Sequence, residues 1–209
     1  MTHRPLALGL MGGTFDPPHA GHIAAARFAL ERFGFARVEL VPSFSPPHKP
    51  SRPLSAPYHR YAMTVLATLP EVGLTVSWRE LVRGGVSYTI DTLREARAAS
   101  PGTAIVFVLG TDQFAEIATW REPRAIVEEF GLIVVGRPGT GFRAAVAALP
   151  DWAAGAVRDG RIREAAMEPV DLSATEVRGR VASGRSIAGL VAEGVSQYID
   201  RYELYRSGG

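Results

Sequence analysis

The sequence predicts an α/β fold in which a parallel β-sheet carries helices on both faces. Two observations predict it: short runs rich in Val, Ile and Leu alternate with segments of helical spacing, and Gly, Pro or Ser bounds most of the runs. Such an alternation favours parallel strands joined by right-handed crossovers. A chain of 209 residues suits a single domain with a small helical C-terminal part.

Five apolar runs and a more polar sixth segment are expected to form the strands. The first five are short and bounded by turn-forming residues, as buried strands usually are. The pattern loosens beyond Gly136, so the sixth run is the weakest. The expected strands cover residues 6–11, 38–41, 74–78, 104–109, 132–135 and 161–166.

Four segments between these strands have helical spacing or many helix-forming residues. Pro123 lies inside the fourth, and because proline lacks the amide that a helix interior needs, we expect that segment to divide near Glu122. Ser173 and Glu176 have the spacing of a capping box, which predicts that another helix begins at Ser173. The expected helices cover residues 21–33, 58–69, 89–99 and 114–130, with others at 142–149, after Ser173 and at 196–206.

The composition is that of a globular protein. Hydrophobic residues make up 46% of the chain and charged residues 21%, and the net charge of +2 comes without a basic run, so neither nucleic acid nor a membrane surface is indicated as a partner. No apolar run reaches the length of about eighteen residues that suggests a bilayer span. The first residues lead into a strand and cysteine is absent, so we expect a cytoplasmic protein. A homo-oligomer is compatible with the sequence, which does not decide the oligomeric state.

Residues 12–22, which we call the phosphate turn, are the most informative part of the chain. They read Gly-Gly-Thr-Phe-Asp-Pro-Pro-His-Ala-Gly-His and join the first expected strand to the first expected helix. Glycines let a backbone approach an anion closely, and the first amides of a helix point outward at the positive end of its dipole. His19 and His22 share one helix face, so both can meet one ligand. The segment is therefore predicted to bind phosphate.

Other interpretations of this segment were weighed against phosphate binding. The chain contains neither Gly-x-Gly-x-x-Gly nor the P-loop pattern, which excludes the commoner phosphate loops. A zinc site lacks cysteine ligands and a His-Glu-x-x-His motif. A helix start with two solvated or capping histidines stays an equal alternative on these residues alone. Asp16 is interpreted as a structural residue that bonds its own turn before Pro17 and Pro18.

Lys49 is the only lysine among 23 basic residues. A compact ammonium can meet a phosphate where a guanidinium fork does not fit. A single lysine can also occur by chance, but the surrounding Pro-Pro-His-Lys-Pro loop favours a functional role. Because ligands bind beyond the carboxyl ends of parallel strands, this loop, the phosphate turn and residues 110–113 are expected to meet at one sheet edge.

Taken together, these motifs resemble a known family. The phosphate turn and residues 173–178 resemble the nucleotidyltransferase superfamily of adenylyl and cytidylyl transferases. Residues 41–49, 87–93, 110–112 and 120–121 are similar to segments of bacterial nicotinate-nucleotide adenylyltransferases. The resemblance covers nearly the whole chain. It implies a Rossmann-like single domain over residues 1–209, with a core at about 6–136 and a C-terminal part at about 161–206 that completes the ATP site.

The resemblance implies that ATP and nicotinate mononucleotide react to nicotinate adenine dinucleotide and pyrophosphate, a step of NAD biosynthesis. The attacking group is then the phosphate of the substrate, which is mostly dianionic at neutral pH, so no protein nucleophile is needed. The protein has to position two anions and stabilise developing charge. Mg²⁺ is expected to travel with ATP, with no metal ligand from protein side chains.

Roles for individual residues follow from the resemblance. His22 is expected at the α-phosphate and His19 at the β- or γ-phosphate, while Trp120 stacks on the pyridine ring. Asp112 serves either the ribose or the organisation of the site. The expected catalytic residues are His19, His22, Lys49 and Arg178; the ATP-binding residues are Gly12, Gly13, Thr14, Phe15, Ser173 and Thr175; the nicotinate-nucleotide-binding residues are Thr89, Gly110, Asp112, Trp120 and Arg121. Trp78 and Trp152 are interpreted as packing residues.

Three alternatives accompany this interpretation. A related adenylyltransferase can act on nicotinamide mononucleotide or phosphopantetheine. A regulatory module can hold ATP without turnover, although a binder has no need for charge directed at a transition state. A dehydrogenase is suggested by Glu39 near the end of the second expected strand, but the fingerprint glycines are missing.

Overall fold

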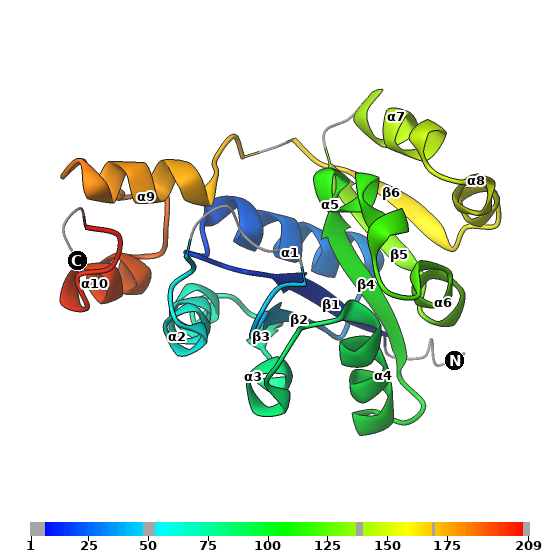
Figure 1. Cartoon of the computed structure of the whole chain (residues 1–209), viewed down its shortest axis with the longest axis horizontal. Helices are drawn as coiled ribbons and strands as arrows, with labels where there is room; N and C mark the ends of the chain where they lie inside the picture. The colour runs from blue at the N-terminus through cyan, green and yellow to red at the C-terminus, as the bar shows by residue number, and fades with distance from the viewer. Residues whose placement is uncertain (1–6, 48–52, 137–139, 169, 207–209) are drawn as a thin grey trace.

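A six-stranded parallel sheet forms the centre of the protein (Figure 1). The computed structural model describes residues 7–47, 53–136, 140–168 and 170–206. The strand order is β3-β2-β1-β4-β5-β6, and every neighbouring pair is parallel, so the predicted fold class is confirmed. The strands are β1 (Ala7–Gly13), β2 (Arg37–Pro42), β3 (Leu74–Val76), β4 (Ala104–Gly110), β5 (Leu132–Gly136) and β6 (Ile162–Ala166).

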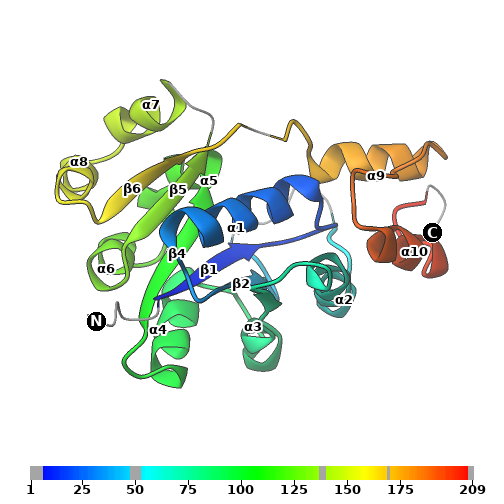
Figure 2. The same cartoon turned by 180° about the vertical axis from the view of Figure 1, so that it is seen from behind.

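Helices cover both faces of this sheet, as Figures 1 and 2 show from opposite sides. Each face has its own apolar core, because alternate residues of a strand point to opposite faces. In β4, Phe107 and Leu109 pack with α4, α6, α7 and α8, whereas Val108 belongs to the core that contains α1, α2, α9 and α10. The helices are α1 (Ala20–Phe33), α2 (Pro57–Thr68), α3 (Arg79–Arg83), α4 (Thr89–Ala99), α5 (Thr111–Ala115), the 3₁₀ turn η1 (Ile117–Thr119), α6 (Pro123–Glu129), α7 (Thr140–Ala148), α8 (Asp151–Arg158), α9 (Ala174–Ala182) and α10 (Glu193–Arg201).

The expected helix at 114–130 divides where the sequence indicates. Glu122 has a φ of 50°, in the left-handed region, and Pro123 opens α6 at the helix start where a missing amide costs nothing. The segment contains three pieces rather than two, because α5 and η1 precede the break.

Three further differences have local causes. The third strand ends at Val76 rather than at residue 78, since Trp78 is the N-cap of the unpredicted helix α3. Trp78 is 67% exposed beside the edge strand, so its interpretation as a packing residue was wrong. Helix α8, which begins after Pro150, was also unpredicted. The closing helix covers residues 193–201 rather than 196–206, and a turn follows in which Glu203 and Tyr205 have positive φ.

Within the described ranges, no helix has the length and apolar character needed to cross a membrane.

Candidate active site

Two neighbouring cavities lie at the carboxyl ends of the central strands. The larger has a volume of about 510 Å³ and the smaller about 240 Å³. Gly12, Gly13, Thr14 and Gln113 line both cavities, so the cavities adjoin along the end of β1 and the start of α5. The strand order changes direction between β1 and β4, and α/β sheets bind ligands at such a point.

The phosphate turn connects β1 to α1 at the junction of the cavities. A Cβ on Gly13 would lie 2.9 Å from Cζ of Phe15, so glycine is required there. Phe15 itself has a φ of 49° and is buried, and its ring meets that of His22 edge-on at 5.0 Å. The Phe15 side chain therefore packs against the His22 ring and lines neither cavity.

His19 and His22 lie together at the start of α1 and line the larger cavity. Their ring centroids are 3.7 Å apart, and the backbone amide of His19 donates to Nδ1 of His22. Burial lowers the pKa of His19 to about 4. Burial, and then the neighbouring His19, lower the pKa of His22 to about 3. Both rings are therefore neutral at pH 7, and each carries one N–H that can donate to an anion.

The remaining wall of the larger cavity comes from β4, β5 and the segment before α9. Gly110 and Asp112, which the sequence assigned to the nicotinate nucleotide, lie here rather than in the smaller cavity. Asp112 is the one carboxylate in this lining among the described residues. The C-terminal part reaches the cavity through Met167, Val170 and Leu172, which sequence reasoning did not single out.

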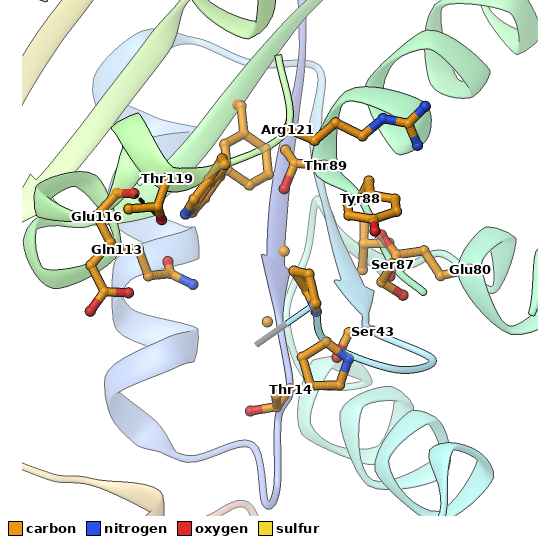
Figure 3. Close-up of a pocket in the computed structure, with 17 residues that line it drawn as sticks. Thr14, Ser43, Glu80, Ser87, Tyr88, Thr89, Gln113, Glu116, Thr119 and Arg121 are labelled. Carbon is orange, nitrogen blue, oxygen red and sulfur yellow. Dashed lines mark hydrogen bonds between the residues drawn. The ribbon is translucent and has the colours of Figure 1, made fainter. Parts of the chain in front are cut away.

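Thr89, Trp120 and Arg121 line the smaller cavity, as expected for residues that share a ligand. Figure 3 labels Thr89 and Arg121 in this lining. Trp120 packs edge-on against Phe107 with centroids 6.0 Å apart. The Arg121 guanidinium lies 4.8 Å from the centroid of the Tyr88 ring and 3.3 Å from a carboxylate oxygen of Asp91. The Arg121 guanidinium therefore has partners on both Tyr88 and Asp91.

Glu80 places a buried carboxyl group beside the same cavity. The Thr92 hydroxyl donates to Oε1 of Glu80, and burial raises the pKa of the Glu80 carboxyl group. Ser43 adds a buried hydroxyl that has no hydrogen-bond partner among the described residues. No sequence pattern indicated a role for Glu80, because α3 is too short to show a periodic pattern.

Arg60 is a fully buried cation beneath the two loops. Its guanidinium donates to the carbonyls of Thr14 at 2.8 Å, Phe44 at 3.1 Å and Ser55 at 2.9 Å. It therefore ties the phosphate turn to the loop after β2. Sequence reasoning missed this residue, although its spacing from the buried Met63, Thr64 and Ala67 on α2 places it on the inner helix face.

The C-terminal candidates lie outside both cavities. Ser173 caps α9 by accepting a hydrogen bond of 3.1 Å from the Glu176 amide. Arg178 donates to the backbone carbonyl of Asp16 at 2.7 Å and to the Thr175 hydroxyl at 2.9 Å. In the part of the chain that the structure describes, none of Ser173, Thr175 and Arg178 belongs to either lining. Lys49 lies outside the described residues.

Glu39 is not available for the ribose of a dinucleotide. Arg37 donates to one oxygen of its carboxylate at 2.9 Å and Arg79 to the other at 2.8 Å. The dehydrogenase interpretation therefore loses its one supporting residue.

The parallel sheet, the phosphate turn and the two adjoining cavities define a nucleotidyltransferase-type protein. The cytidylyltransferase-like family model matches residues 10–180. More narrowly, the chain belongs to the nicotinate-nucleotide adenylyltransferase family. It is 39% identical to the probable nicotinate-nucleotide adenylyltransferase of Salinibacter ruber, covering 96% of this chain and 98% of that one. The corresponding protein of Bordetella petrii is 42% identical, with 95% and 98% covered.

Solved structures share the fold. The nicotinic acid mononucleotide adenylyltransferase of Plasmodium falciparum, complexed with NaAD, superposes with a TM-score of 0.72 at 18% identity and covers 96% of this chain and 97% of that one. The same enzyme complexed with APC gives a TM-score of 0.71 at the same identity and coverage.

Proposed function

We propose that this protein transfers the adenylyl group of ATP to nicotinate mononucleotide, which forms nicotinate adenine dinucleotide and releases pyrophosphate. One observation carries the proposal: two cavities of different character adjoin at the phosphate turn. The larger one contains the two histidines, and the smaller one contains Trp120 and Thr89. A two-substrate transfer needs such an arrangement, because the reacting phosphates of both substrates have to meet at one point.

ATP occupies the larger cavity in this proposal. The neutral imidazoles of His19 and His22 donate their N–H groups to its phosphates, with His22 at the α-phosphate. The backbone of Gly12 and Gly13, with Thr14, lines the path of the phosphates toward the smaller cavity.

Nicotinate mononucleotide occupies the smaller cavity. Trp120 provides an aromatic surface for the pyridine ring, and Thr89 with the backbone at Arg121 receives the carboxylate. Thr89 is the first residue of α4, so the amides of that helix start also favour a negative charge.

The reaction needs no covalent intermediate. A phosphate oxygen of nicotinate mononucleotide attacks the α-phosphorus of ATP, the new P–O bond forms, and the bond from that phosphorus to the bridging oxygen of the β-phosphate breaks. The electron pair of the broken bond leaves with pyrophosphate. His22 faces the α-phosphate oxygens, where a positioned donor stabilises the charge of the transition state.

Magnesium enters with ATP as part of the substrate. Within the described residues, no group of three or more His, Asp or Glu side chains is arranged to hold a metal ion. In this proposal the triphosphate oxygens and water would hold Mg²⁺, which would add positive charge to the departing pyrophosphate. Asp112 lies in the same lining and can orient the bound water or the ribose.

Lys49 and the start of α9 complete the phosphate site in this proposal. The bond from Arg178 to the Asp16 carbonyl holds α9 against the phosphate turn, which supports roles for Ser173, Thr175 and Arg178 toward the triphosphate. Residues 161–206 would thus complete the ATP site, whose other residues belong to the core at 6–136. The chain would act in the cytoplasm, as its lack of cysteine suggests.

Product analysis tests the proposal. The purified protein is incubated with Mg²⁺, ATP and one acceptor at a time: nicotinate mononucleotide, nicotinamide mononucleotide or phosphopantetheine. We expect pyrophosphate and nicotinate adenine dinucleotide with the first acceptor at the highest kcat/KM. Preference for another acceptor would change the assigned substrate, and ATP binding without pyrophosphate release from any acceptor would indicate a non-catalytic ATP-binding module.

A further inference from the structure

The turn that follows α10 returns to the phosphate turn. The hydroxyl of Tyr205 donates to Oδ1 of Asp16 at 2.7 Å, across 189 positions of the sequence. Tyr205 is half-buried and packs against the core that contains α1 and α2, and its hydroxyl lies 3.9 Å from Sδ of Met63. The end of the described chain therefore makes a directed polar contact with the loop that carries the histidines.

Asp16 is a junction for segments that are distant in sequence. Its carboxylate is buried, and its Oδ2 accepts the Ser55 amide at 3.3 Å. Its backbone carbonyl accepts Arg178 at 2.7 Å. Asp16 was interpreted as a structural residue of its own turn, and these partners extend that role to the loop before α2, to α9 and to the turn after α10. The position of Asp16, three residues before His19, is thus set by three other parts of the fold.

The backbone conformations on both sides of this contact need support from their surroundings. Phe15 has a φ of 49° and Tyr205 a φ of 64°, in the left-handed region that residues with a Cβ rarely adopt. Such residues persist where neighbouring contacts hold them, and they concentrate at functional sites. Burial and the nearby Asp16 carboxylate raise the pKa of the Tyr205 hydroxyl, so it stays a donor at every physiological pH.

We propose that Tyr205 is a positioning residue, whose hydroxyl fixes Asp16 and thereby aligns the phosphate turn and its two histidines for adenylyl transfer. This inference rests on the proposed function for its catalytic readout. Its physical basis is that in-line transfer is sensitive to displacements well below the size of a side chain. Ground-state ATP binding depends on many contacts and is less sensitive to the same displacement.

The variant Tyr205→Phe tests this proposal, because it keeps the ring and removes the hydroxyl. Tyr202→Phe is the matched control: Tyr202 lies in the same turn, is 54% exposed, and its ring packs in a tilted arrangement against that of Tyr198 rather than against the phosphate turn. Two readouts are taken well below the unfolding temperature of each variant: steady-state kinetics and amide hydrogen exchange over residues 12–19.

We expect Tyr205→Phe to lower kcat at least about fivefold with a change in KM for ATP of less than about twofold. We also expect faster amide exchange over residues 12–19, whereas Tyr202→Phe leaves both readouts at the wild-type level. Wild-type kcat together with wild-type exchange in Tyr205→Phe overturns the proposal, as does an equal loss in the control. If the wild-type protein forms no nicotinate adenine dinucleotide, the proposed function fails and the exchange measurement alone decides the role of Tyr205.

Discussion

The backbone amide of His19 donates a hydrogen bond of 3.2 Å to Nδ1 of His22. Because Nδ1 acts as the acceptor, the proton of the neutral His22 ring lies on Nε2. The helix start thus fixes both the orientation and the tautomer of His22, so that its one N–H is available for a phosphate oxygen in the larger cavity.

Replacing His22 with alanine should slow the reaction without weakening ATP binding. We expect kcat to fall by roughly 100-fold or more, since a donor directed at developing charge is worth about that much, while KM for ATP changes little. Steady-state kinetics with purified His22→Ala measures both. His59→Ala is the control, since His59 of α2 forms a hydrogen bond with the Tyr198 hydroxyl of α10 and lines neither cavity. A change in KM alone would contradict the role of His22.

The two histidines should also make the free protein less stable in mild acid. Their folded-state pKa values of about 4 and about 3 lie below the ordinary value of 6.5, so the unfolded chain binds more protons than the folded chain between these limits. Stability from this source is present above pH 6.5 and is lost as the pH falls toward the folded-state values.

Thermal unfolding at pH 7.5 and pH 5.0 measures this effect in wild type and in the double variant with His19→Gln and His22→Gln. A loss of about 1 kcal/mol lowers Tm by roughly 2–4 °C in a chain of this size. We therefore expect the wild-type Tm to fall by at least about 3 °C more than that of the double variant. Equal falls in the two proteins would show that other groups cause the acid sensitivity.

Local patterns predicted the parts of the fold that local physics determines. Helix α4 covers residues 89–99 as expected, and the break at Glu122 follows from the ring of Pro123. The carboxyl ends of the strands were predictable to within two residues, so the sequence also predicted that Gly12, His22 and Asp112 converge at one sheet edge. Parallel topology alone brings these residues together.

Contacts between distant segments left no comparable signal. The bond of Tyr205 to Asp16 spans nearly the whole chain, and no periodicity in either segment marks it. Glu80 is buried where the unpredicted helix α3 packs against α4, and the Thr92 hydroxyl of α4 donates to its carboxylate. The placement of Asp112 in the larger cavity depends on how α5 begins after β4, which a motif match does not specify.

Replacing Arg60 with lysine should destabilise the protein although the charge is kept. The three carbonyls that accept from the Arg60 guanidinium belong to two loops, and a lysine ammonium on its unbranched stem cannot meet all three. We expect the free energy of unfolding in urea to fall by about 2 kcal/mol or more, because buried carbonyls lose their donors. The exposed arginine at the end of α8 supplies the control, Arg158→Lys, for which a change within about 0.5 kcal/mol is expected.

Lys49→Arg tests the interpretation of the single lysine. If Lys49 meets a phosphate as a compact point charge, the arginine variant should lose activity despite its positive charge, because the guanidinium is larger and planar. The measurement is kcat/KM for ATP in the variant and in wild type. An unchanged value would mean that any cation suffices at this position, or that the lysine has no role in the reaction.

Replacing Trp120 with alanine should affect the pyridine nucleotide rather than ATP. Trp120 lines the smaller cavity and is held edge-on by Phe107, so its indole presents a fixed surface for a ring. Stacking of a base on an aromatic side chain is worth about 1–3 kcal/mol, which corresponds to an increase in KM for nicotinate mononucleotide of roughly 5- to 150-fold. KM for ATP should stay within about twofold of wild type. Trp78→Ala, at an exposed tryptophan outside both linings, should leave both constants unchanged. Equal increases in both KM values for Trp120→Ala would indicate that the indole supports the whole site and does not select the acceptor.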